Sequence, residues 1–224
     1  MTKNKNIIIL GCPRSGTSLV ANLVRSAGYD VDDNGSQRLM KPNKLYNPDG
    51  YFERIDIVQL NDCLIKEIGE KYNFLNCPSL TEIISYTYSA NQNLNNIREK
   101  LISNNGWSLK DSRLAFTLHL YRLQNINIIK VLRDRNAVKK SMQNHYGPLF
   151  EQEVVQGPHT VYPIVFDEYY STINDCIDWQ AKNFNQVTLY YDDIVNGKID
   201  KLDDFIEGHV DRSLVNAKYR HYTE

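Results

Sequence analysis

Short, continuous runs of hydrophobic residues alternate along the chain with segments in which apolar residues recur every three or four positions. The runs are typical of buried strands in a parallel sheet, and the periodic segments are typical of amphipathic helices. The pattern predicts strands at residues 7–10, 107–110, 128–132 and 187–191. It predicts helices at residues 19–27, 57–68, 94–102, 114–121, 135–141, 169–180 and 202–206. This alternation predicts an α/β fold with a doubly wound parallel sheet flanked by helices.

Three long polar segments interrupt the alternation. A loop or flap is expected at residues 30–50, which are rich in Asn, Gly and Pro. An irregular segment is expected at residues 73–93, and a surface excursion at residues 145–163. The sequence has no internal repeat and no low-complexity linker. We therefore expect one domain over residues 1–224, with variable, substrate-side segments at about 30–50 and 145–170.

The composition is that of an ordinary globular protein, since 42% of the 224 residues are hydrophobic and 24% are charged. Lys and Arg number 26 against 27 Asp and Glu, and this balance argues against a nucleic-acid coat or a polybasic membrane anchor. No stretch approaches the roughly 18 apolar residues of a membrane span. The four cysteines lack C-x-x-C spacing, which favours free thiols in a reducing compartment, so we expect a cytoplasmic protein.

The first predicted strand leads into a loop, GCPRSGTS at residues 11–18, whose two glycines have the spacing of a Walker A loop. Such a loop, between a strand and a helix, directs backbone N–H groups and the helix dipole at an anion. Thr17 stands in the position of the Walker lysine, and Arg14 is the one cation of the loop. We therefore expect an anion other than a metal-chelated triphosphate. The alternative is an ordinary tight turn.

A second candidate anion site follows the strand at residues 128–132. Arg133 leaves the end of this strand, where open α/β sheets bind ligands, and Ser141 lies eight residues further on, in the next helix. A guanidinium and a hydroxyl that converge on one point form a phosphate clamp. The alternative is an ion-paired surface Arg and a Ser that packs without a ligand. Asp134, the best candidate for an Mg²⁺ ligand, lies between two arginines.

In these features the chain resembles the sulfotransferases that use PAPS (3′-phosphoadenosine 5′-phosphosulfate). Residues 13–18 are similar to the family's 5′-phosphosulfate loop, and Arg133 and Ser141 have the family's interval for 3′-phosphate ligands. Patterns of bacterial-type members are similar to residues 47–53 (NPDGYFE), 107–113 (WSLKDSR) and 191–194 (YDDI). The resemblance covers most of the chain. It implies a P-loop NTPase-like sulfotransferase fold and transfer of a sulfuryl group from PAPS to a hydroxyl or amine.

The resemblance also implies roles for individual residues. Arg14 would stabilise the charge on the oxygen between sulfur and the departing phosphate. Glu53 would be the base, because Ser112 stands where many members have a His; the alternatives are substrate positioning, a structural ion pair or a solvated carboxylate. Lys110 would add charge near the sulfuryl group or pair with Asp111. The residues expected to bind the donor are Arg14, Ser15, Gly16, Thr17, Ser18, Arg133, Ser141 and Tyr191.

Some positions depart from the family pattern or keep two interpretations. Leu19 stands where the soluble branch often has a Trp, and the basic 3′-phosphate loop has only scattered candidates, Arg212, Lys218 and Arg220. Tyr191 is expected either beside the adenine or as a core Tyr that ends a strand. Arg113 is expected to be an internal partner of a carboxylate.

The expected acceptor is a small molecule or a carbohydrate, with no metal, no nucleic acid and no membrane span. The histidines show no metal signature; we expect a structural role for His119, and His145 is a candidate for the border of the acceptor pocket. An aromatic platform or core packing is expected of Tyr146, Phe150, Tyr162, Tyr169 and Tyr170. Two rival functions stay open: a P-loop kinase or nucleotidase that uses ATP and Mg²⁺, and a nucleotide-binding protein without catalysis.

Overall fold

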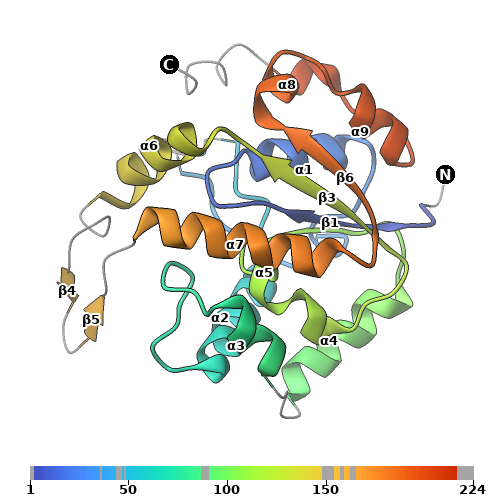
Figure 1. Ribbon diagram of the computed structural model, residues 1–224. Coiled ribbons are helices and arrows are strands. Elements are labelled where there is room, and N and C mark those ends of the chain that lie inside the picture. Colours follow the sequence, from blue (N-terminus) through green and yellow to red (C-terminus); the bar gives the residue numbers. More distant parts are fainter. Residues whose placement is uncertain are drawn as a thin grey trace.

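The structure, a computed structural model, describes residues 3–35, 37–43, 47, 49–86, 91–147, 154–156, 159–161 and 165–215. Four parallel strands form one sheet: β1 (Asn6–Leu10), β2 (Ser108–Lys110), β3 (Ile126–Leu132) and β6 (Asn185–Tyr190). Their spatial order is β2-β1-β3-β6 (Figure 1). Ile8 of β1 lies opposite Leu109 and Ile128 in the register. The predicted α/β fold with a parallel sheet is confirmed.

Helices connect the strands and cover both faces of the sheet (Figure 1). The α-helices are α1 (Thr17–Ser26), α2 (Ile55–Ile68), α3 (Leu80–Ser85), α4 (Gln92–Ser103), α5 (Leu114–Thr117), α6 (Arg135–Tyr146), α7 (Phe166–Ala181), α8 (Tyr191–Val195) and α9 (Asp200–Phe205). The 3₁₀ helices are η1 (Leu118–Tyr121) and η3 (Arg212–Leu214). A separate antiparallel pair, β4 (Val154–Gln156) and β5 (His159–Val161), lies within the predicted surface excursion.

Two predictions of local structure were wrong. The segment predicted to be irregular contains α3, because Ser79 and Glu82 form a capping box in which each side chain accepts the other's backbone N–H. Tyr191, interpreted in one of two ways as a core Tyr that ends a strand, is buried in a hydrophobic core, but it is the first residue of α8 and not the last of a strand. The predicted helix at 114–121 is a short α-helix that continues as a 3₁₀ helix.

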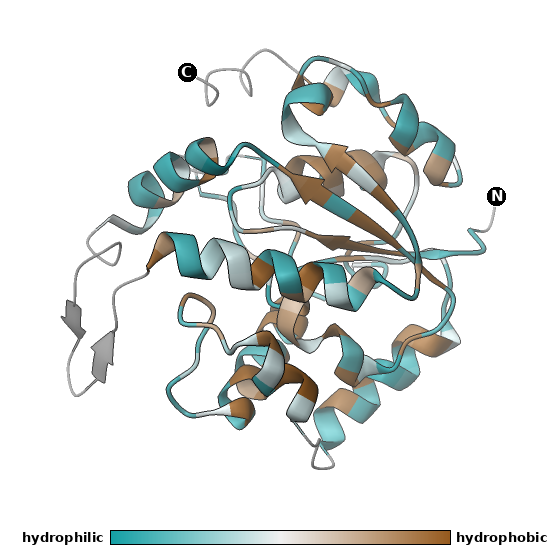
Figure 2. Cartoon of the chain, in the orientation of Figure 1, coloured by the Kyte–Doolittle hydropathy of each residue, from teal (hydrophilic) through white to brown (hydrophobic). Residues whose placement is uncertain are grey.

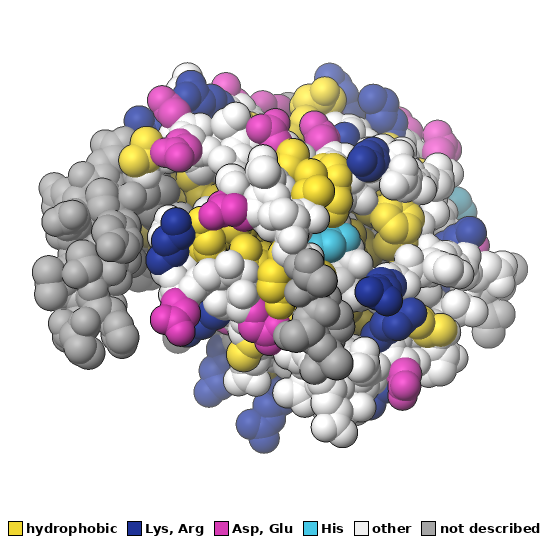
Figure 3. Space-filling model, turned by 60° about the horizontal axis from the view of Figure 1, so that its bottom comes forward, with side chains coloured by type: hydrophobic (Ala, Val, Ile, Leu, Met, Phe, Trp, Pro, Cys, Tyr) yellow, Lys and Arg dark blue, Asp and Glu magenta, His cyan; other side chains and the backbone are white. Residues whose placement is uncertain are grey.

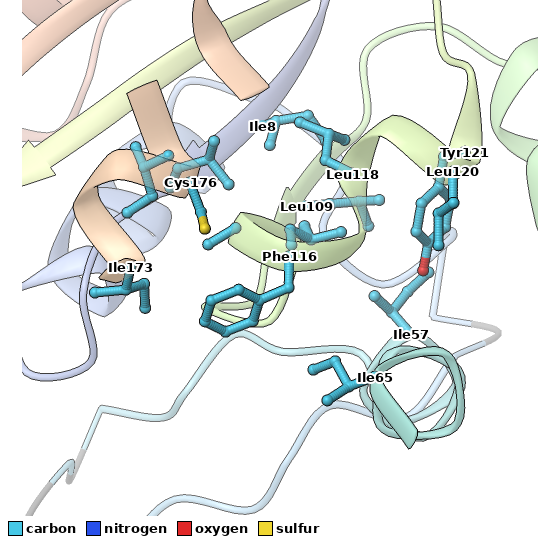
Figure 4. Packing of buried hydrophobic residues seen from close by; sticks show 14 of the residues in the cluster. Ile8, Ile57, Ile65, Leu109, Phe116, Leu118, Leu120, Tyr121, Ile173 and Cys176 are labelled. Atoms are coloured by element: carbon cyan, nitrogen blue, oxygen red, sulfur yellow. The ribbon is translucent and has the colours of Figure 1, made fainter. Parts of the chain in front are cut away.

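Successive residues of β1 pack into two different hydrophobic cores, because side chains alternate across a strand. Ile8 and Leu10 contribute to a core with α2, α5 and α7, which Figure 4 shows from close by around Phe116 and Ile173. Ile7 and Ile9 contribute to the opposite core, with α1, α8 and α9. Figure 2 shows the strands as predominantly hydrophobic and the outer helix faces as hydrophilic. Burial of both faces explains the continuous apolar run of β1, whereas β6, at the edge of the sheet, is largely exposed or half-buried.

The surface of the molecule carries mixed charge. On the face shown in Figure 3, acidic and basic side chains are interspersed, and hydrophobic side chains gather between them beside a histidine. Within the described residues, no helix has both the length and the apolar content needed to cross a bilayer. All four cysteines are free thiols, and Cys12 and Cys176 are buried.

Candidate functional site

A cavity of about 400 Å³ opens at the carboxyl ends of β1, β2 and β3. Each of these strands delivers part of its wall, as expected for ligand sites of open α/β sheets. Of the predicted site residues, the wall contains Arg14, Gly16, Thr17, Ser18, Glu53, Lys110, Arg133, Ser141 and Tyr191. Ser15 lies buried within the loop and does not line the cavity. The structure thus brings together residues from five separate segments of the sequence.

The loop after β1 is held in an uncommon backbone conformation. Arg14 has φ 70° and Gly16 has φ 97°, both in the left-handed region. A Cβ atom on Gly16 would lie 2.3 Å from Cδ2 of Tyr191, so only glycine fits beneath this ring. The Ser15 hydroxyl is buried and has no hydrogen-bond partner among the described residues. Strained backbone and an unsatisfied donor are features of sites that gain contacts from a ligand.

The two predicted anion sites are adjacent. Nε of Arg14 donates a hydrogen bond to Oγ of Ser141 at 3.1 Å, and Nη1 of Arg133 donates to the backbone oxygen of Arg14 at 3.1 Å. The Arg133 guanidinium also lies 4.4 Å from the centre of the Tyr191 ring, a cation–π contact. Burial lowers the pKa of Arg133 below its ordinary value, and Arg14 adds to this effect. An anion would offset the cost of placing two guanidinium groups so close together.

Lys110 and Glu53 form a buried ion pair in the wall of the same cavity. Lys110 is 7% exposed and Glu53 is 8% exposed, and the ammonium group donates a hydrogen bond to Oε1. The alternative prediction that Lys110 pairs with Asp111 was wrong, since its ammonium reaches the carboxylate of Glu53. Burial is the main cause of a raised pKa at Glu53; the charge of Lys110 opposes the rise and the charge of Asp111 adds to it.

The chain segment before Glu53 is tied to the first turn of α1. Nδ2 of Asn47 donates to Oγ of Ser18 at 3.0 Å, and Ser18 donates in turn to the backbone oxygen of Tyr51 at 3.4 Å. Phe52 then adopts φ 55°, in the left-handed region, and directs the chain into α2. Asn47 and Tyr51, both part of a pattern noted from the sequence, therefore tie the segment that leads to Glu53 to the start of α1.

A hydrogen-bonded cluster lies behind the ion pair, and its residue Asn61 was missed by the sequence analysis. Asn61 of α2 is fully buried and bonds the carboxylate of Asp111, which follows Lys110 directly. Arg113 forms ion pairs with Asp111 and Asp62, as expected of an internal partner of carboxylates. A polar residue on the apolar stripe of a predicted helix is the signal that could have identified Asn61.

Aromatic side chains form the wall beyond Glu53, namely Tyr51, Phe74 and Tyr146. Phe74 stacks against the Arg113 guanidinium, 4.5 Å from the ring centre. His145 also lines the cavity, and burial, together with the charge of Arg14, lowers its pKa. Of the other aromatic residues predicted to form a platform, Tyr169 and Tyr170 do not line the cavity, and Phe150 and Tyr162 lie outside the described residues.

The structure describes some of the remaining predicted positions. Leu19 lines the cavity from α1. Arg212 forms ion pairs with Asp200 and Asp203, while Lys218 and Arg220 lie outside the described residues.

A scan against protein-family models found no match, and no curated protein matches the chain.

Proposed function

We propose that the protein is a sulfotransferase with a P-loop NTPase-like sulfotransferase fold. It would move a sulfuryl group from PAPS to a hydroxyl or amine and release 3′,5′-bisphosphoadenosine. The supporting observation is the meeting of three features in one cavity: the strained Arg14 loop, the Arg133–Ser141 pair and the buried Lys110–Glu53 pair. A donor with a phosphosulfate and a separate phosphate needs two cationic sites, and proton removal from the acceptor needs a base beside them.

The described residues fit such a donor. The backbone of the loop would bind the phosphosulfate at the start of α1, because Arg14, Gly16 and Thr17 line the cavity. Arg133 and Ser141 would bind the 3′-phosphate, and Tyr191 would flank the adenine. The hydrogen bond from Arg14 to Ser141 would then be replaced by contacts with the two anionic groups.

The transfer forms a bond from the acceptor oxygen or nitrogen to sulfur and breaks the bond from sulfur to the phosphate oxygen, which leaves with the electron pair. Glu53 would take the acceptor proton, and its raised pKa makes its carboxylate a stronger base than a solvated one. Arg14 would stabilise the charge on the leaving oxygen. Lys110 would hold Glu53 in place and face the sulfuryl group. This route uses no metal.

The acceptor would enter along the aromatic wall of Tyr51, Phe74 and Tyr146. A small molecule or a carbohydrate with one apolar face matches these side chains, because both stack on aromatic rings. A cytoplasmic location belongs to the proposal as well and is supported by the four free cysteines.

Thermal unfolding with 3′,5′-bisphosphoadenosine, compared with ATP plus Mg²⁺, tests the donor site. A ligand at a hundred times its Kd adds about 2.7 kcal/mol, which raises Tm by roughly 5–10 °C for a chain of this size. We expect this rise with the bisphosphate alone and its loss in Arg133→Ala. Arg135→Ala is the matched control, because Arg135 is exposed and pairs with Asp167 on the surface.

The outcomes separate the rival functions. A rise only with ATP and Mg²⁺ would favour the kinase or nucleotidase, and no rise with either ligand would reject the proposal. A rise with the bisphosphate, followed by no transfer of sulfate from PAPS to phenol, alcohol, sugar or amine acceptors, would favour a nucleotide-binding protein without catalysis.

A further inference from the structure

Arg113 lies in the wall of the cavity, and its guanidinium has one nitrogen that no described residue uses. Nε donates to Oδ1 of Asp62 at 2.6 Å, and Nη1 donates to Oδ1 of Asp111 at 3.0 Å. Nη2 donates to no residue in the part of the chain that the structure describes, and it is not sealed inside the protein. Its N–H groups are therefore available to a molecule bound in the cavity.

The guanidinium of Arg113 is fixed in this place. Its Cζ lies 4.5 Å from the centre of the Phe74 ring, two carboxylates hold its edges, and its side chain is only 14% exposed. Burial acts to lower the pKa of Arg113, but the charges and hydrogen bonds of Asp111 and Asp62 outweigh it, so the group stays cationic. A donor that is already fixed binds a ligand oxygen without a further loss of side-chain freedom.

The charges around Arg113 indicate which kind of oxygen Nη2 binds. The ion pairs at this end of the cavity combine three carboxylates (Glu53, Asp62 and Asp111) with two cations (Lys110 and Arg113). The surplus charge is negative, and the donor proposed above adds more. A carboxylate or a sulfate on the acceptor would be repelled. A hydroxyl, ether or carbonyl oxygen can accept from Nη2 without this repulsion.

The rings beside Arg113 indicate the rest of the acceptor. Tyr51, Phe74 and Tyr146 line the same cavity, so the acceptor has an apolar face that packs against them. It also has two oxygens, one that receives the sulfuryl group and one that meets Nη2. Sugars and glycosides combine a face of C–H groups with several uncharged oxygens. A simple phenol, alcohol or amine lacks the second oxygen.

We propose that Arg113 selects the acceptor by donating a hydrogen bond from Nη2 to a second, uncharged oxygen of a sugar or glycoside. The proposal rests on the function proposed above, in which this cavity binds PAPS and the acceptor. Arg113 would bind the acceptor, while Glu53 takes the proton of the reacting hydroxyl. An acceptor without a second oxygen would leave the buried guanidinium without this partner and would react more slowly.

A purely structural role for Arg113 predicts something different. If Arg113 only ties Asp62 of α2 to Asp111 after β2, its replacement should lower the rates with all acceptors by the same factor. Arg113→Lys keeps a cation for the two carboxylates but lacks the planar fork that makes three directed contacts at once. The ratio of two rates in one preparation does not depend on the fraction of the variant that is folded.

The experiment compares kcat/KM for the methyl glycosides of glucose, galactose and N-acetylglucosamine with kcat/KM for cyclohexanol, with PAPS as the donor. Cyclohexanol is the matched acceptor, because it has the ring and one hydroxyl but no second oxygen. We expect the best glycoside to exceed cyclohexanol by roughly 10–100-fold, the contribution of a hydrogen bond to a charged group. Arg113→Lys should remove most of this preference. Arg25→Lys, at an exposed position in the last turn of α1, is the control and should keep it.

Binding gives a second readout that does not need transfer. The ¹H–¹⁵N signal of Arg113 Nε, assigned by its absence in Arg113→Lys, should shift when a glycoside is added in the presence of 3′,5′-bisphosphoadenosine. Cyclohexanol should not shift it.

The outcomes separate this inference from the proposed function. A preference that Arg113→Lys leaves unchanged would overturn the inference, as would transfer to cyclohexanol or phenol but to no glycoside; in both cases the sulfotransferase stands. A shift with a glycoside in a protein that never transfers sulfate would uphold the binding by Arg113 and reject the proposed function. Neither a shift nor transfer to any acceptor would overturn both.

Discussion

Charged side chains are buried at the carboxyl end of the parallel sheet and exposed in the cavity at its amino end. At the carboxyl ends, Glu53, Lys110, Asp111 and Arg133 are all less than 9% exposed and lie in or directly behind one cavity. At the amino ends of β3 and β6 there is a second cavity, of about 240 Å³, lined partly by Leu118, Leu123, Trp179 and Phe184.

The charged side chains that line the second cavity are exposed to solvent. Its basic residues, Arg122 and Lys182, are exposed, and burial lowers the pKa of His119 to about 4, so its imidazole is neutral at neutral pH. Burial of a charge is costly unless a partner or a ligand offsets it. A cavity of this size is therefore not by itself an indication of function. The buried charged groups at the carboxyl end of the sheet are such an indication.

The largest expected effect is that of Glu53→Gln at the carboxyl end. The Gln amide cannot take the proton from the acceptor substrate, so turnover should fall by a factor of roughly 10²–10⁴. Binding of the bisphosphate should be retained. Glu70→Gln, at an exposed position after α2, is the control and should leave turnover unchanged. Steady-state rates of sulfate transfer measure both variants. Full turnover in Glu53→Gln would leave the buried ion pair as a structural feature only.

Gly16→Ala should destabilise the fold by roughly 1–3 kcal/mol and weaken binding of the bisphosphate. The new methyl group would collide with the Tyr191 ring and would also sit on a backbone with positive φ. Gly197→Ala separates these causes, because Gly197 has φ 80° and nothing within 4 Å of the added Cβ. Urea unfolding should show the smaller loss in Gly197→Ala. Equal losses would mean that backbone strain alone, without Tyr191, accounts for the destabilisation of Gly16→Ala.

The sequence predicted those parts of the site that depend on local order. The strand, loop and helix at residues 7–27 follow from apolar periodicity and from two glycines, and Arg133 follows from its place after a buried strand. Their common location follows from the parallel sheet, since the carboxyl ends of its strands meet at one edge.

The sequence could not predict the contacts that depend on packing. Lys110 and Glu53 are 57 positions apart, and only the docking of α2 against the end of β2 makes them partners. In the sequence, Asn61 is one polar residue among apolar ones. Only the fold brings its hydrogen-bond partners Thr117, Tyr121 and Asp111 beside it. By contrast, the capping box of α3 was missed although the spacing of Ser79 and Glu82 is a local signal that the sequence alone contains.

The smallest expected effect concerns His119 at the amino end. Its folded-state pKa lies below the value near 6.5 of an unfolded chain, so the unfolded state binds the proton more tightly. Stability should therefore be lost as the pH falls from about 6.5 to about 4, by roughly 1–2 kcal/mol once the partial exposure of the ring is taken into account.

His119→Asn should remove this loss, since an amide does not titrate and its oxygen can still accept the hydrogen bond from Gln180 that the ring nitrogen accepts. The exposed His209→Asn is the matched control and should keep the wild-type dependence. Urea unfolding at pH 7 and pH 4.5 measures the difference. If His119→Asn still lost the full wild-type amount, the acid sensitivity would belong to carboxylates whose pKa is lowered in the folded state, such as Glu82 and Asp203, and not to His119.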